Sequence, residues 1–165
     1  MSMKRAIIKG YRPGAIGKIT ELHALYYHRH WGFDLYFERK VAQDMAEFLG
    51  RFDSAGNGLW LAVRREGIVG SIAVDVSNLH YEGAHLRWFI VAPSHQGWGL
   101  GRALIDQAVN FCDERGVERI RLWTFSGLDA ARHIYESHGF TLMREYEDRQ
   151  WGSPVTGQMF ERRGP

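Results

Sequence analysis

The sequence predicts an α/β protein with a mixed β-sheet of about six to seven strands and about four helices. Apolar residues recur at helical spacing near the start and then fall in short runs rich in Val, Ile and Trp, which are typical of strands. In the second half, strand, helix, strand and helix follow one another. That order predicts a parallel strand pair with a right-handed crossover.

The first half is expected to form one strand, two helices and a hairpin. The short polar turn Arg64-Arg65-Glu66-Gly67 between two β-rich runs predicts that the hairpin is antiparallel. The expected elements are a strand over residues 6–11, helices with apolar faces from Ile16 to Tyr26 and from Val41 to Phe52, a turn over 53–58, and strands over 59–63 and 68–76.

The second half is expected to alternate strands and helices. Gly116 and Gly139 follow the two helical patterns and predict where these helices end. The expected elements are a strand over 86–91, a helix that begins in the glycine-rich stretch 97–101, a strand over 119–124, a helix over 129–138, and strands over 140–151 and 155–161 about a Gly152-Ser153-Pro154 turn.

Length and composition limit the classes of function. With 165 residues the chain has the usual size of one domain, and we expect a single domain over residues 1–165. A formal net charge of +2 is too small for a dedicated nucleic-acid surface, so a small-molecule partner is expected. No stretch has the length and apolarity of a signal peptide or membrane span, so no membrane partner is expected.

Cys112 is the only cysteine, so the chain cannot form an internal disulfide, and a cytoplasmic location is expected. Its helical spacing with Leu104, Ala108 and Phe111 predicts a buried thiol rather than a nucleophile.

The stretch Gln96-Gly97-Trp98-Gly99-Leu100-Gly101 lies between an expected strand and an expected helix. Glycines let the backbone approach a ligand, and free N–H groups at a helix start attract phosphate. The Walker loop needs Gly-Lys followed by Ser or Thr, whereas this chain continues with Arg102 and Ala103. The dinucleotide fingerprint needs a small residue where Arg102 or Leu104 stands. An ordinary tight turn would explain the glycines alone equally well.

Together with a second motif, this loop resembles a known superfamily. Gln96 to Gly101 is similar to the Gln/Arg-x-x-Gly-x-Gly/Ala pyrophosphate loop of the GNAT N-acetyltransferases, and the helix ending Tyr135-Glu136-Ser137-His138-Gly139-Phe140 is similar to their tyrosine helix. The resemblance implies the GNAT acyl-CoA N-acyltransferase fold, with a centrally splayed sheet. Segments 86–104, 122–124, 131–135 and 157–159 also resemble the acetyltransferase domain fused to MarR-type regulators, here expected to be free-standing.

The resemblance implies an acetyl-CoA-dependent N-acetyltransferase that acts on a primary amine of a small molecule or peptide. Backbone N–H groups of the loop would bind the pyrophosphate, and the end of the strand before it would lie along the pantetheine arm. Tyr135 would protonate the leaving thiolate. The implied coenzyme contacts are Phe89, Ile90, Val91, Gln96, Gly97, Trp98, Gly99, Leu100, Gly101, Arg102, Ala103 and Tyr135.

One position departs from the GNAT sequence pattern, and the identity of the general base is left open. Relatives commonly place an asparagine where this chain has Leu128, so that coenzyme contact is in question. The general base of many relatives corresponds to a position near His85, with Glu82 just upstream. Histidine has an ordinary pKa of about 6.5, which suits a base, but a histidine at a strand edge is also a common surface residue. Some relatives use no dedicated base.

The acceptor is expected beside the first helices and the last two strands. Aromatic density there fits an apolar or aromatic amine, although aromatics at helical spacing are equally typical of a core. No metal is expected at Tyr27-His28-Arg29-His30, because residues two apart on a helix face different sides. An exposed strand edge would allow a homodimer. The candidate acceptor residues are His23, Tyr26, Tyr27, Trp31, Phe33 and Glu38.

Two alternatives to an enzyme remain. One is a non-catalytic acetyl-CoA-binding sensor that keeps the loop without efficient chemistry. The other is a phosphate-binding regulatory module unrelated to coenzyme A.

Overall fold

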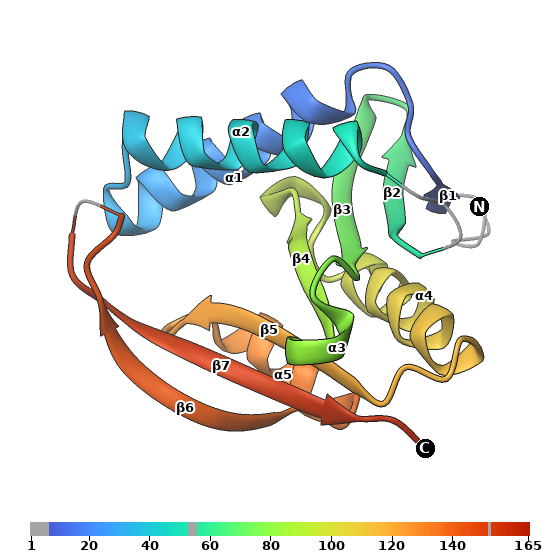
Figure 1. Cartoon of the computed structure of the whole chain (residues 1–165). Helices are drawn as coiled ribbons and strands as arrows, with labels where there is room; N and C mark the ends of the chain where they lie inside the picture. The colour runs from blue at the N-terminus through green and yellow to red at the C-terminus, as the bar shows by residue number, and fades with distance from the viewer. Residues whose placement is uncertain (1–6, 53–55, 152) are drawn as a thin grey trace.

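The computed structural model describes residues 7–52, 56–151 and 153–165. Parts of the expected first strand, of the turn at 53–58 and of the turn at Gly152 lie outside these residues. The elements are β1 (Ile7–Lys9), α1 (Ala15–Trp31), α2 (Leu35–Gly50), β2 (Gly58–Arg64), β3 (Gly67–Asp75), α3 (Leu79–Glu82), β4 (Ala84–Val91), η2 (Pro93–His95), α4 (Leu100–Glu114), β5 (Arg119–Phe125), α5 (Asp129–Ser137), β6 (Thr141–Asp148) and β7 (Val155–Arg163) (Figure 1).

The strands form a seven-stranded mixed sheet in the order β1-β2-β3-β4-β5-β7-β6. The predicted antiparallel β2–β3 hairpin, the parallel β4–β5 pair and the β6–β7 hairpin are confirmed. Strand β7 lies between β5 and β6 and pairs with β5 from Arg119↔Arg163 to Phe125↔Gly157. This order was not predicted, because a hairpin pattern does not tell which of its two strands joins the sheet.

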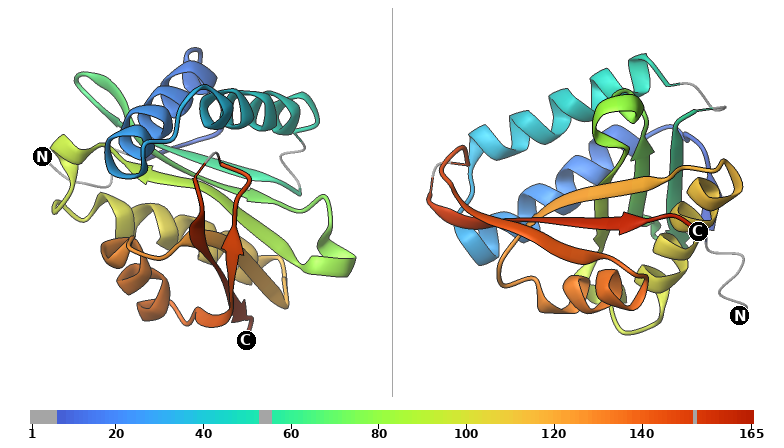
Figure 2. Two further views of the ribbon diagram at one scale, coloured as in Figure 1. Left: turned by 90° about the vertical axis from the view of Figure 1, so that its left-hand side faces the viewer. Right: turned by 60° about the horizontal axis from the view of Figure 1, so that its bottom comes forward.

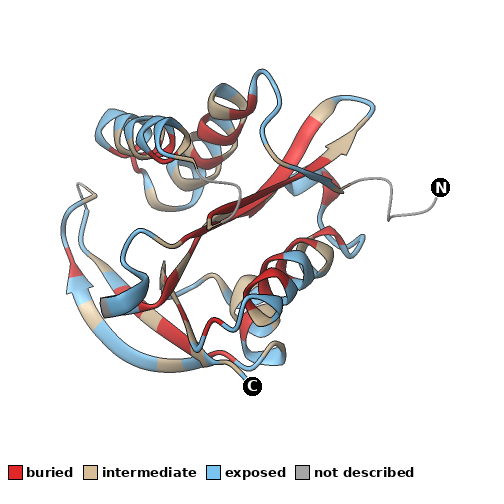
Figure 3. Ribbon diagram, turned by 45° about the vertical axis from the view of Figure 1, so that its right-hand side comes forward, coloured by how far each residue is buried: buried red, intermediate tan, exposed pale blue. Residues whose placement is uncertain are grey.

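Helices cover both faces of the sheet (Figure 2). Along β2, Leu59 and Leu61 pack in the core cluster shared with α1 and α2, whereas Trp60 and Ala62 pack in the cluster shared with α4. This alternation follows from the two-residue repeat of a strand. Buried residues accordingly run along β2 and β3 and along the inner sides of the helices (Figure 3).

The predicted burial of Cys112 is confirmed, and burial raises the pKa of its thiol to about 12. In the described segments, every helix is too short or too polar to cross a lipid bilayer.

Two helical elements differ from the expectation. Helix α2 begins at Leu35, before the expected apolar face at Val41, because Phe37 is also buried one turn earlier on the same side. The one-turn helix α3 was not predicted, since four residues are too few to show a helical repeat.

Strands β4 and β5 separate soon after they begin. In the described part of the chain they pair at Ala84↔Ile120 and His85↔Arg121 and then diverge. On the other side of β4 the register with β3 shifts between Ser71 and Ala73, which is the mark of a β-bulge. At the bulge Trp88 has a φ of 49°, and its carbonyl accepts a hydrogen bond of 2.6 Å from Ser71 Oγ. The β5-facing edge of β4 after His85 is therefore free of strand partners.

An aromatic cluster bridges this gap at the end nearest α1 and α2. Phe33 packs with Phe37 at 5.2 Å between ring centroids and with Phe125 of β5 at 5.7 Å. The β6–β7 connection contributes Trp151, whose indole donates to Asp148 Oδ2 at 3.1 Å. Trp151 in turn lies 5.4 Å from Phe37. Ring packing thus replaces the missing strand pairing and fixes the width of the gap.

Candidate active site

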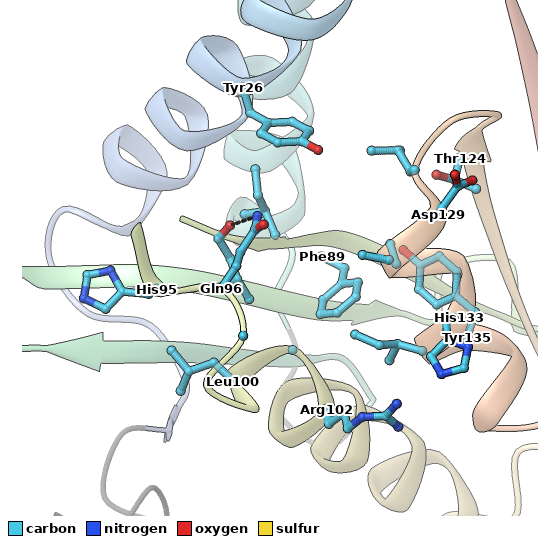
Figure 4. A pocket seen from close by; sticks show the side chains of 18 of the residues that line it. Tyr26, Phe89, His95, Gln96, Leu100, Arg102, Thr124, Asp129, His133 and Tyr135 are labelled. Carbon is cyan, nitrogen blue, oxygen red and sulfur yellow. Dashed lines mark hydrogen bonds between the residues drawn. The ribbon is translucent and has the colours of Figure 1, made fainter. Parts of the chain in front are cut away.

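A cavity of about 820 Å³ lies where β4 and β5 diverge, between the end of β4, the start of α4 and helix α5 (Figure 4). It brings together ten of the twelve residues predicted to contact the coenzyme. The ten are Phe89, Ile90, Val91, Gln96, Gly97, Gly99, Leu100, Gly101, Arg102 and Tyr135.

The glycine loop presents its backbone to this cavity. Gly97 and Gly99 both have a φ of +82°, and a Cβ added at Gly97 would meet no atom within 4 Å. Gly99 precedes α4, and no side chain caps the helix. The first N–H groups of α4 therefore have no partner within the helix, and the helix dipole adds positive potential there. Leu100 is buried and anchors this first turn to the core.

Trp98 and Ala103 are the two predicted contacts that do not line the cavity. Trp98 is 57% exposed and packs outward, 5.8 Å from the His95 ring and under the Arg64 guanidinium at 5.5 Å. Trp98 can therefore offer only its backbone to a ligand in the cavity, whereas the N–H of Ala103 already donates to Gly99 O at 3.0 Å.

The free edge of β4 also faces this region. Ala92 N–H donates to Val69 O of β3 at 2.7 Å, whereas the carbonyl of Val91 accepts from Gln96 Nε2 at 3.0 Å on the opposite side. Because successive residues of a strand point their N–H groups to alternate sides, the N–H groups of Phe89 and Val91 lie on the free edge.

Tyr135 is a buried residue of α5, and Figure 4 shows its hydroxyl directed into the cavity. Its ring lies 5.7 Å from Phe89 and 6.0 Å from Phe160. Burial raises the pKa of the phenol well above its ordinary value of 10, and the neighbouring Tyr27 adds to this shift. The hydroxyl is therefore a protonated hydrogen-bond donor at neutral pH.

The departure at Leu128 also falls on this cavity. Leu128 stands at the cap position of α5 and lines the wall, with Asp129 beside it. An apolar side chain thus occupies the place where relatives commonly carry an amide.

A second cavity, of about 210 Å³, adjoins the first on the side of α1, α2 and the β6–β7 hairpin. Tyr27, Phe89, Thr124 and Tyr135 line both cavities. The two spaces therefore meet at the Tyr135 phenol. The remaining residues around the second cavity are His23, Phe37, Lys40, Val41, Asp44, His85, Leu86, Arg87, Trp88, Leu122, Trp123, Phe125 and Trp151.

The two candidate bases have different positions. His85 lines the second cavity, with its ring 4.5 Å from Trp123. Burial, together with the charge of Arg87, lowers the pKa of His85 to about 3, although Asp75 opposes the shift. The ordinary pKa of about 6.5 that suggested this residue as a base does not apply here. Glu82 is exposed on α3 and lines neither cavity.

The predicted acceptor residues are divided among three places. His23 and Tyr27 line the second cavity, and Tyr26 lines the first. The other three, Trp31, Phe33 and Glu38, line neither cavity.

Sequence reasoning missed the charged side of the second cavity, where Lys40, Asp44 and Arg87 meet. The spacing of Lys40 and Asp44 on one helix could have indicated their ion pair, but not that Arg87 joins it. Among the described residues, no three His, Cys, Asp or Glu side chains are grouped as metal ligands would be.

A comparison with known protein families shows which family the chain belongs to. The model of the Acetyltransferase (GNAT) family matches residues 17–140, and this range contains both cavities' central residues, Phe89 and Tyr135. The chain belongs to the GNAT acetyltransferase family. The glycine loop and the tyrosine helix, whose resemblance was the basis of the prediction, both lie within the matched GNAT region.

Individual relatives agree with GNAT membership. A mycothiol acetyltransferase from Beutenbergia cavernae is 42% identical over 64 residues, which cover 39% of this chain and 21% of that protein. An uncharacterised N-acetyltransferase from Methanocaldococcus jannaschii is 28% identical over 81% of this chain and 62% of its own length. The chain thus spans less than two thirds of these relatives.

A solved acetyltransferase from Salmonella typhimurium, described as putative and holding acetyl-CoA, shares the GNAT fold with a TM-score of 0.67. It is 17% identical, and the match covers 96% of this chain and 94% of that one.

The low pKa of His85 has a consequence for stability. In the folded chain His85 stays neutral down to about pH 3, whereas in the unfolded chain it takes up a proton near pH 6.5. Its contribution to stability is therefore complete above pH 6.5 and is lost as the pH falls toward 3. Between pH 7 and pH 5, we expect the free energy of unfolding to fall by about 1–2 kcal/mol less in His85→Gln than in the wild type. Urea denaturation of both proteins at both pH values measures this, and equal losses would contradict it.

Proposed function

We propose that the chain is an acetyl-CoA-dependent N-acetyltransferase that transfers an acetyl group to a primary amine of a small molecule or peptide, with residues 1–165 acting as one domain. The observation that carries the proposal is the meeting of two cavities at Phe89 and Tyr135 in the gap between β4 and β5. GNAT membership and the acetyl-CoA held by the Salmonella neighbour support the identity of the donor.

The residues of the first cavity fit the coenzyme. N–H groups from Gly97 to Arg102 would hold the pyrophosphate, where the backbone at Gly97 is open and the helix dipole is favourable; the N–H of Ala103, also expected to take part, already donates to Gly99 O. The free N–H groups of Phe89 and Val91 would bind the pantetheine arm and the thioester oxygen in the manner of an added strand. Acetyl-CoA supplies an activated acetyl group on a thiol leaving group.

The reaction moves one proton as well as the acetyl group. A C–N bond forms to the amine, the C–S bond breaks, and the proton lost by the amine restores the thiol. Tyr135 would donate a hydrogen bond to the developing thiolate. The same burial that raises the phenol's pKa also disfavours an uncompensated thiolate, so this donor would be essential to the step.

His85 would act as a neutral hydrogen-bond acceptor for the incoming amine, directly or through water. With a pKa of about 3 it is a weak base, so the amine would have to reach the site largely unprotonated.

A homodimer stays a prediction. Strand β6 forms one edge of the sheet and carries the exposed Met143, which supports pairing at that edge.

The role of the loop is tested by Gly99→Val. Gly99 and Gly116 have similar positive φ angles, 82° and 67°, but Gly116 lies beyond the opposite end of α4. The strain of a side chain at either position should therefore be similar, about 1–2 kcal/mol. We expect Gly99→Val to weaken acetyl-CoA binding at least about tenfold in calorimetry, while Gly116→Val retains the wild-type affinity. Equal affinities in both variants would refute the loop assignment.

The role of the phenol is tested by Tyr135→Phe. Loss of a general acid typically costs about 10²-fold or more in rate, so we expect kcat to fall by about that factor while the affinity for acetyl-CoA stays the same. Tyr146→Phe, on β6 outside both cavities, is the matched control and should keep its kcat. Unchanged turnover in Tyr135→Phe would exclude the proton-donor role. Acetyl-CoA binding without turnover of any amine by the wild type would favour the sensor alternative.

A further inference from the structure

The charged side chains of the second cavity form one group. Lys40, Asp44 and Arg87 line the cavity, so two cations and one carboxylate face the space. Asp44 bonds to Lys40 at 3.0 Å and lies 3.4 Å from Arg87. One carboxylate cannot neutralise both cations.

The residues behind this group do not remove the excess. Arg87 also lies 3.3 Å from Asp75, but Asp75 is paired more closely with Arg51 at 2.7 Å. When both outer residues are included, three cations still face two carboxylates. The two histidines of the cavity add no charge at neutral pH, because burial lowers the pKa of His23 to about 4 and that of His85 to about 3. This group of side chains therefore carries a net positive charge.

The wall shared by the two cavities consists of Tyr27, Phe89, Thr124 and Tyr135. None of these four side chains is a carboxylate that would hold an ammonium ion, which suits an amine that must be unprotonated when it attacks. An acceptor bound in the second cavity would thus direct a neutral amine toward Tyr135 and a negative group toward Lys40 and Arg87.

Much of the remaining cavity wall is aromatic. It includes Phe37, Trp123, Phe125 and Trp151. The volume of about 210 Å³ suits a small molecule. A second ammonium group, as in a polyamine, would lie against Lys40 and Arg87 and be repelled.

We propose that the acceptor is a small amine that also bears a carboxylate, of the α-amino-acid class, with an apolar or aromatic side chain. This inference rests on the proposed function. The Lys40 ammonium has donors beyond its bond to Asp44, and its side chain is 40% exposed, so it can reach a ligand carboxylate. The Arg87 guanidinium is stacked on Trp88 at 4.1 Å and is held in place for the same group.

The test uses acceptors that differ only in the carboxylate. Thiol release from acetyl-CoA is measured with L-phenylalanine against phenethylamine, with L-methionine against 3-(methylthio)propylamine, and with spermidine. Because the amines differ in pKa, kcat/KM is referred to the unprotonated amine. We expect each carboxylate-bearing acceptor to be favoured at least tenfold, about 1.4 kcal/mol, and spermidine to be a poor acceptor.

A variant links this preference to the cavity. Lys40→Met should lower the ratio of kcat/KM for L-phenylalanine to that for phenethylamine about tenfold. Lys18→Met, which removes an α1 lysine paired with Glu21 outside both cavities, should leave the ratio unchanged.

The inference would be overturned, and the proposed function left intact, by equal or better turnover of the amines without a carboxylate. A preference for spermidine or an unchanged ratio in Lys40→Met would have the same consequence. So would the absence of turnover with every carboxylate-bearing amine when acetyl-CoA still binds. Failure to bind acetyl-CoA in calorimetry would instead overturn the proposed function, and this inference with it.

Discussion

The early separation of β4 from β5 is the constraint on which the rest of the structure depends. The two strands pair at Ala84 and His85 and then diverge, so one edge of β4 keeps its backbone groups free in the middle of a sheet. Unpaired backbone groups are unfavourable when buried. The larger cavity gives them access to solvent or to a ligand instead. Under the proposed function, this free edge of β4 is where the coenzyme would bind.

Three local features maintain this separation. The bulge at Trp88 turns β4, and Ser71 fixes the turned carbonyl with a hydrogen bond of 2.6 Å. The aromatic cluster around Phe33 holds the far side of the gap, with Asp148 positioning Trp151 above it. Between them, α5 places the Tyr135 phenol at the junction of the two cavities. The packing and the proposed chemistry therefore share residues, because Phe37, Phe125 and Trp151 of this cluster also line the second cavity.

Local sequence patterns predicted the helices and strands and the candidate coenzyme loop. Contacts between segments that are distant in the sequence could not be predicted in this way. The loop from Gln96 to Gly101 was recognisable because its chemistry is contiguous in the chain. The insertion of β7 beside β5 and the meeting of Lys40 with Arg87 depend on tertiary packing. The low pKa of His85 likewise arises mainly from burial in the folded chain, so its residue type alone did not predict this pKa.

Amide hydrogen exchange with and without saturating acetyl-CoA tests the use of this gap most directly. Bound coenzyme should slow exchange at the N–H groups of Phe89 and Val91 and in the loop from Gly97 to Arg102, while the exposed edge of β6 exchanges as before. Slowed exchange at the loop alone would contradict the claim that the free edge of β4 binds the ligand. Unchanged exchange in both segments, despite binding, would place the coenzyme elsewhere on the molecule.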